Sequence, residues 1–167
     1  MTVASPAGFR TSTFQWMEPL AGDMGPTSDI AIQALAARRE SVKAARDFTQ
    51  SVLAGWGAAC LEDDLALVVS ELVTNALCHG LGAGRDDATD VAHNIQLALL
   101  RKGERVMCAV QDPGESLPET QAGGEDEESG RGLYLVGCFS DSWGWFPLNG
   151  MGRRTGKVVW AMFEIRG

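Results

Sequence analysis

The sequence predicts a single α+β domain, a two-layer α/β sandwich in which helices pack on one face of a mostly antiparallel mixed sheet. The apolar run at 63–78 has the length and spacing of a helix. Two strand-like runs, 94–100 and 104–111, flank Lys102-Gly103 and indicate a hairpin. Helices placed before and after such a hairpin favour a layered arrangement with the helices gathered on one face.

The chain before this hairpin divides into a short leading segment and the start of the domain. Residues 1–30 are expected to be poorly ordered, with a possible first strand at 13–17, and residues 31–167 to form one domain. A first helix is predicted at about 31–54. A later start near Ser41 stays open, because the Ala/Arg-rich segment before it has only a weak apolar stripe.

The second half of the chain adds one helix and two strands to this arrangement. The glycine-rich segment 80–84 ends the helix at 63–78 abruptly. A short helix is predicted at 131–139, followed by strands at 141–146 and 157–165. Three tryptophans lie on these strands and are expected to pack in the interior, because Trp buries a large apolar area: Trp143, Trp145 and Trp160.

Composition limits the classes of function. The chain has 167 residues, 45% of them hydrophobic, and a formal net charge of -8, which disfavours direct binding to nucleic acid or anionic membranes. No apolar stretch is long enough to cross a bilayer and no signal peptide is recognisable, so we expect a cytoplasmic protein. The four cysteines form no metal-binding pair and are expected to be buried, reduced thiols.

The most informative segment is the helix at 63–78 and the residue that follows it. Glu71, Asn75 and His79 are spaced by four residues, so they line one face of the helix. A carboxylate can take a proton from a hydroxyl group, and a carboxamide oxygen can bind a hard cation such as Mg²⁺. The alternative is a solvated helix edge, but the preceding apolar run favours a mostly buried helix.

Two glycine-containing motifs follow. Asp112-Pro113-Gly114 ends the second hairpin strand, where a carboxylate could accept a hydrogen bond from an exocyclic amine and Gly114 would let a flat base approach the backbone. Gly130-Arg131-Gly132-Leu133 precedes a predicted helix, whose N-terminus would favour a phosphate, with Arg131 adding charge. Taken singly, the first motif is a turn signature and the second a glycine hinge.

The order and combination of these motifs resemble the ATP site of the GHKL, or Bergerat-fold, superfamily, over about residues 41–164. Within it, four segments resemble small ATP-binding proteins of the anti-sigma factor serine kinase type, as found in actinobacteria: 44–48, 69–77, 130–133 and 159–161. The resemblance implies ATP and Mg²⁺ as ligands, a sigma factor or an antagonist protein as partner, and a homodimer.

The resemblance also implies roles for individual residues. Glu71 would be the catalytic base, Asn75 would bind Mg²⁺, and Asp112 would recognise adenine. The glycines Gly114, Gly130 and Gly132 would shape the pocket and its lid. The other residues predicted to bind the nucleotide are His79, Arg131 and Leu133.

The chain departs from the pattern of these proteins in two places. Ser116 replaces a glycine of the base-binding segment, and Val158 replaces a threonine whose hydroxyl would help to bind adenine, with Thr155 close by in sequence. The segment between Asp112 and Gly130 is also rich in carboxylates and has no Lys or Arg. Such a run is typical of a solvated loop; the other hypothesis is a lid that folds only against a basic partner.

Two functions of different classes therefore stay open. The first is an ATP-dependent protein serine/threonine kinase that also sequesters a sigma factor, favoured by Glu71 and Asn75. The second is a non-catalytic or degenerate nucleotide-binding module that docks on a regulator, favoured by Ser116, Val158 and the acidic segment. A detached histidine-kinase catalytic domain is a weaker third reading, because no helical pair carries a phosphoacceptor histidine.

Overall fold

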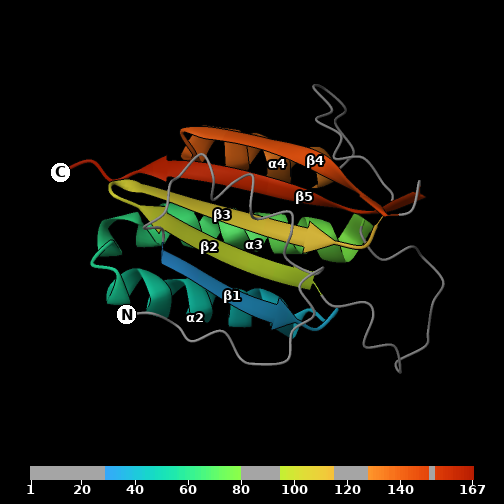
Figure 1. Ribbon diagram of the computed structural model, residues 1–167, viewed down its shortest axis with the longest axis horizontal. Coiled ribbons are helices and arrows are strands. Elements are labelled where there is room, and N and C mark those ends of the chain that lie inside the picture. The colour runs from blue at the N-terminus through green and yellow to red at the C-terminus, as the bar shows by residue number, and fades with distance from the viewer. Residues whose placement is uncertain (1–28, 80–94, 115–127, 151–152) are drawn as a thin grey trace.

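A single antiparallel sheet organises the described part of the chain (Figure 1). The computed structural model describes residues 29–79, 95–114, 128–150 and 153–167. Their strands follow the order β1-β2-β3-β5-β4, and every pairing among them is antiparallel. The strands are β1 (Asp29–Leu35), β2 (Ile95–Lys102), β3 (Arg105–Asp112), β4 (Ser142–Gly150) and β5 (Arg153–Glu164).

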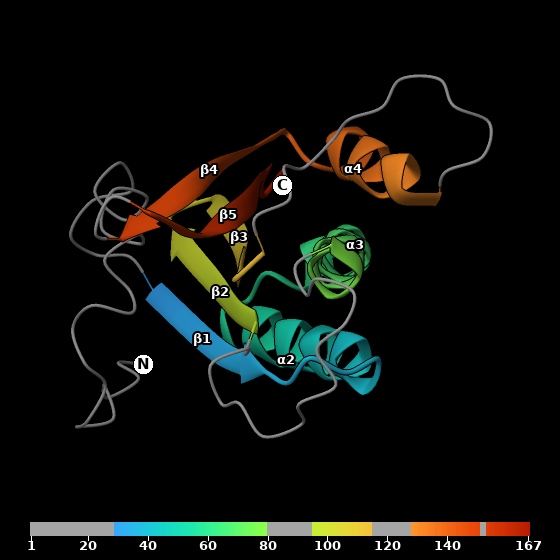
Figure 2. The same ribbon diagram turned by 90° about the vertical axis from the view of Figure 1, so that its right-hand side faces the viewer.

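The helices cover one face of this sheet, as Figure 2 shows edge-on. They are α2 (Glu40–Gly55), the short 3₁₀ turn η1 (Ala59–Leu61), α3 (Glu62–His79) and α4 (Glu128–Phe139). Helix α3 lies between α2 and α4 and packs against both of them and against β3. The predicted fold class, a two-layer α+β sandwich, is confirmed.

The main core lies between the sheet and the helices. Side chains of a strand alternate between its two faces, so every second residue of the three central strands points to the helices. These residues are buried with apolar residues of α3 such as Leu65, Val69 and Val73. On the strands the set comprises Ile95, Leu97, Leu99, Val106, Cys108, Val110, Val159, Ala161 and Phe163.

The opposite face of the sheet carries a second, smaller apolar cluster. Its buried members are the intervening residues of the same strands, with aromatic side chains such as Phe146 and Trp160 packed against them. Trp143 and Trp145 pack instead against the main core. The prediction that these tryptophans serve packing is confirmed. The buried members of this second cluster are Ala98, Leu100, Met107, Ala109 and Val158.

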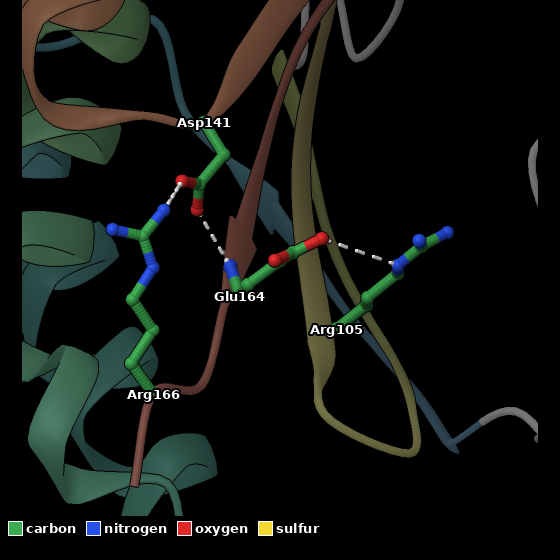
Figure 3. Close-up of polar contacts among 4 residues, drawn as sticks. All are labelled: Arg105, Asp141, Glu164 and Arg166. Atoms are coloured by element: carbon green, nitrogen blue, oxygen red, sulfur yellow. Dashed lines mark hydrogen bonds and ion pairs between the residues drawn. The ribbon is translucent and has the colours of Figure 1, made fainter.

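Polar contacts tie the end of α4 to the central strands (Figure 3). Asp141, just after α4, accepts the backbone N–H of Glu164 at 2.7 Å and the Arg166 guanidinium at 2.5 Å. Its own backbone N–H donates to the carbonyl of Met162 at 2.9 Å. The Glu164 carboxylate pairs with Arg105 of β3 at 3.7 Å. The connection from α4 to β4 is thus anchored on β5.

Two predicted helix starts are wrong, and the last two strands, β4 and β5, extend four residues further toward each other than predicted. The segment predicted as the start of a helix at 31 instead forms β1, whose residues pair with β2 from Asp29 to Leu35. An edge strand gains its hydrogen bonds from a distant partner, which local sequence spacing does not reveal. The alternative start near Ser41 is confirmed by α2, which begins at Glu40. The possible strand at 13–17 lies outside the described residues.

The second boundary error concerns α4. The helix predicted from 131 begins at Glu128, so the glycine motif lies inside its first turns rather than before it. Glycine is a poor helix former, and for that reason a sequence reading places it outside the helix. The predicted helix at 63–78 and the hairpin around Lys102-Gly103 are confirmed by α3, β2 and β3.

The cysteines differ from expectation. All four are free thiols, but only Cys108 is buried, on the helix-facing side of β3. Burial away from water raises the pKa of the Cys108 thiol to about 12. The exposed cysteines are Cys60, Cys78 and Cys138. They lie on helical segments whose apolar neighbours face inward, so proximity in sequence to apolar residues did not imply burial.

This difference predicts selective thiol chemistry. Because the thiolate is the nucleophile, iodoacetamide at pH 8 should modify Cys60, Cys78 and Cys138 in the folded protein and leave Cys108 unmodified until the chain unfolds. Peptide mass spectrometry after native and denaturing labelling measures this. Rapid native labelling of Cys108 would contradict the packing of β3 against the helices.

Candidate functional site

Helix α3 carries two of the predicted site residues on one face, Glu71 and Asn75. Its apolar positions, including Leu72, Val73 and Ala76, are buried against the sheet. Glu71 and Asn75 lie one turn apart, and both are half-buried. Among the described residues, no hydrogen bond or ion pair engages either side chain. The Glu71 carboxylate and the Asn75 carboxamide therefore lie one helical turn apart, and both are available for a ligand.

Gly132 of α4 packs directly against this carboxylate. A Cβ atom added at Gly132 would lie 2.9 Å from Oε2 of Glu71, closer than real Cβ atoms approach an oxygen. The absence of a side chain at Gly132 thus lets the two helices bring backbone and carboxylate together. This contact joins two motifs that are 61 positions apart in the sequence numbering, 71 and 132. The structure brings them into one site.

The other residues of the glycine motif have different surroundings. Gly130 lies in the first turn of α4, where helix N–H groups have no partner within the helix. Arg131 is exposed, and no contact of its guanidinium is present among the described residues. Leu133 is buried in the main core, so its side chain anchors α4 and does not line the site.

Asp112 lies at the end of β3 on the helix-facing side of the sheet. Its side chain is only 2% exposed, and its Oδ1 accepts the backbone N–H of Gly114 at 2.8 Å. This bond closes a small turn in which an Asp side chain holds the backbone two residues ahead. The turn predicted from Asp112-Pro113-Gly114 is therefore present, with Gly114 also buried.

The adjacent strand approaches Asp112 unusually closely. Gly156 of β5 has φ +145°, and a Cβ atom there would overlap the carbonyl oxygen of Asp112. Both the backbone conformation and the lack of space require glycine at this position. Gly156 thereby allows the next residue of β5 to pair with Asp112 in the ladder.

That next residue is Lys157, which the sequence analysis missed. Lys157 is the Cα partner of Asp112, and its Nζ donates to Oδ1 of Asp112 at 3.1 Å. Its side chain is 6% exposed, so the two charges form a buried ion pair. The signal available in the sequence was the alternation along β5, which sends Lys157, Val159 and Ala161 to the same face.

The same alternation corrects the reading of Val158. The sequence comparison treated Val158 as the missing adenine-binding hydroxyl. Val158 instead lies in the cluster on the opposite face, with Ala98 and Met107, one residue out of phase with Lys157. The Val158 side chain therefore points away from the Asp112 carboxylate. The β5 side chain beside Asp112 is that of Lys157.

The oxygen donors fit a nucleotide-bound magnesium ion. Among the described residues there is no group of three or more His, Cys, Asp or Glu that would hold a metal by itself. Mg²⁺ commonly takes one or two protein oxygens and completes its shell with substrate phosphates and water. Asn75 and Glu71 can supply oxygens of this kind from α3. The donor set is therefore suited to a metal that arrives with a phosphate ligand.

Several sequence predictions lie outside the described residues. His79 is the last residue of α3, but the position of its side chain is not described. Ser116 and most of the acidic segment lie within 115–127, which is outside the described residues, and the side chain of Thr155 is not described either. In the part of the chain that is described, no helix has the length and apolar character needed to cross a membrane.

Comparison with known proteins agrees with this geometry. A family model described as a histidine kinase-like ATPase domain matches residues 35–161, which covers most of the chain and every site residue described above. No curated protein matches the chain at a significant level. The family match implies ATP binding, usually with Mg²⁺.

The contact between Gly132 and Glu71 predicts the effect of adding a methyl group. Gly132→Ala should keep the fold, because alanine favours helix by about 1 kcal/mol and the flexible Glu71 carboxylate can move. A crystal structure should show the carboxylate displaced from its position in the wild type, while the melting temperature changes by only a few degrees.

A matched control is Gly55→Ala at the end of α2, where an added Cβ meets nothing within 4 Å. It should leave both the fold and the Glu71 side chain unchanged. An undisplaced Glu71 in Gly132→Ala would show that the helices are not packed as described.

Proposed function

Because the chain belongs to the histidine kinase-like ATPase family, we propose that it is an ATP-binding regulatory protein that acts as a protein serine/threonine kinase in an anti-sigma factor switch. The observation that carries the proposal is the Glu71 carboxylate on α3, which lies against the glycine motif of α4 and has no partner among the described residues. A regulatory module that only bound nucleotide would not require a half-buried carboxylate at this position.

The other predicted site residues would each bind a different part of the ligand. The end of β3, with Asp112 and Gly114, would bind the base. Asn75 would contribute an oxygen ligand to Mg²⁺, which screens the charge of the phosphates when it is bound. The first turn of α4, with Gly130 and the exposed Arg131, offers N–H groups and a positive charge to the phosphates.

Glu71 would serve as the general base. Its carboxylate accepts the proton of a serine or threonine hydroxyl on the protein substrate. The hydroxyl oxygen forms a bond to the γ-phosphorus, the bond from that phosphorus to the β,γ-bridging oxygen breaks, and ADP leaves with the electron pair. Positioning is the main contribution that the protein makes to such a transfer, and the close packing of α3 on α4 provides it.

The proposed partners follow from the resemblance to anti-sigma factor kinases. The protein substrate would be an antagonist, and its phosphorylation would release it and leave a sigma factor bound to the kinase. A homodimer is the proposed assembly. The net charge of -8 favours protein partners with basic surfaces and disfavours direct contact with nucleic acid.

The alternative is a degenerate module that docks on a regulator without transferring phosphate. Of the features that favoured it, Val158 no longer counts, because it faces away from the site. Its remaining support is Ser116 and the acidic segment, and Ser116 and most of that segment lie outside the described residues.

Calorimetric titration tests the nucleotide site. ATP and ADP should bind the full chain, and binding should be tighter with Mg²⁺. Asp112→Asn should weaken binding roughly tenfold or more, because it removes a charged hydrogen-bond acceptor from the base end. Asp47→Asn, an exposed carboxylate on α2, is the matched control and should bind like the wild type. No binding at millimolar nucleotide would contradict the proposal and favour the docking module.

A second experiment tests catalysis separately. Glu71→Gln should bind ATP with nearly wild-type affinity and lose phosphorylation of the antagonist by two orders of magnitude or more, since the amide cannot accept the hydroxyl proton. The measurement is transfer of labelled phosphate to a partner captured from the organism's own extract. Unchanged phosphorylation of that partner would show that Glu71 is not the base.

A further inference from the structure

The least expected group in the molecule is the ammonium of Lys157. It is buried beside Asp112 with a side chain that is 6% exposed. An ammonium carries three N–H donors. Within the described part of the chain, the single acceptor in contact with it is Oδ1 of Asp112, at 3.1 Å. Two donor positions of a buried cation thus have no acceptor among these residues.

Stability alone does not explain this arrangement. A buried ion pair stabilises a fold no more than a well-packed apolar pair of the same size, because both charges lose their hydration. A buried donor that makes no hydrogen bond carries a further energetic cost. The main core beside it consists of apolar residues such as Val110 and Val159, whose side chains cannot accept a hydrogen bond. The missing acceptors are therefore best supplied by something that binds.

The position of Lys157 indicates which ligand this is. Lys157 and Asp112 are register partners on neighbouring strands and face the same side of the sheet. Together they present an acceptor, the carboxylate, beside a donor, the ammonium. The Watson–Crick edge of adenine has the complementary pair, with the N6 amine as donor and N1 as acceptor on adjacent ring positions.

We propose that Lys157 is a specificity-determining residue that donates a hydrogen bond to N1 of adenine while Asp112 accepts one from N6. This inference rests on the proposed ATP binding and adds to it a second residue that recognises the base. Guanine carries a carbonyl at C6 and an N–H at N1. In the same orientation its O6 would face the Asp112 carboxylate, acceptor against acceptor, and its N1–H would face the Lys157 ammonium, donor against donor. The pair thus selects adenine over guanine.

The test removes the acceptor from the ligand and keeps the protein intact. ATP, 1-deaza-ATP and GTP are titrated into the full wild-type chain by calorimetry. In 1-deaza-ATP a C–H group replaces N1 while the N6 amine is retained. We expect 1-deaza-ATP to bind roughly tenfold more weakly than ATP or worse, the size expected for loss of a hydrogen bond to a charged donor, and GTP to bind more weakly still.

The same titrations on Lys157→Met complete a double-mutant-type cycle, in which the loss of N1 from the ligand is compared with the loss of the ammonium from the protein. Methionine has a similar length and no donor, so ATP and 1-deaza-ATP should bind this variant equally. Lys102→Met, an exposed lysine at the end of β2, is the matched control and should keep the wild-type preference. Melting curves check the fold, and if Lys157→Met does not fold, the comparison on the wild type decides.

The outcomes separate the two proposals. Equal binding of ATP and 1-deaza-ATP to the wild type would overturn the role of Lys157 and leave the ATP site standing. GTP binding as tight as ATP binding would overturn it as well. No binding of any nucleotide would overturn both the role of Lys157 and the ATP site.

Discussion

The register between β3 and β5 is the constraint on which the site depends. Antiparallel pairing aligns Asp112 with Lys157 and sends both side chains to the face that the helices cover. Because side chains alternate along a strand, a slip of one residue would align Asp112 with Val158 and move the charged pair apart. The apolar residues on both faces, Val159 on one and Val158 on the other, oppose such a slip, since it would expose one set and crowd the other.

Helix α3 connects this end of the sheet to the glycine motif of α4. Its apolar residues are buried in the main core, while the Glu71 carboxylate lies against Gly132 of α4 and Asn75 lies one turn further along α3. Gly132 permits the close contact between the helices, and the contacts of Asp141 with β5 hold the far end of α4. Among the described residues the side chains of Glu71 and Asn75 make no hydrogen bond or ion pair, which leaves them available for a ligand, and the family match implies that this ligand is ATP.

Local patterns predicted the parts of the structure that local sequence determines. The long apolar period of α3 and the short hairpin between β2 and β3 were recognisable because each depends on neighbouring residues. β1 was misread because it is an edge strand held by a distant partner. The faces on which Lys157 and Val158 lie depend on the register of strands far apart in the chain, so local sequence did not reveal that Lys157, and not Val158, lies beside Asp112. The start of α4 was misplaced because Gly132 serves a helix contact that only the tertiary structure shows.

The most direct test of this account is a crystal structure of the full chain with a non-hydrolysable ATP analogue and Mg²⁺. The account predicts adenine at the end of β3, with N6 within hydrogen-bond distance of the Asp112 carboxylate and N1 within the same distance of Lys157 Nζ. The phosphates should lie between α3 and the first turn of α4, with the metal near Asn75. A nucleotide bound elsewhere, or an adenine ring with no contact to the Asp112–Lys157 pair, would contradict it.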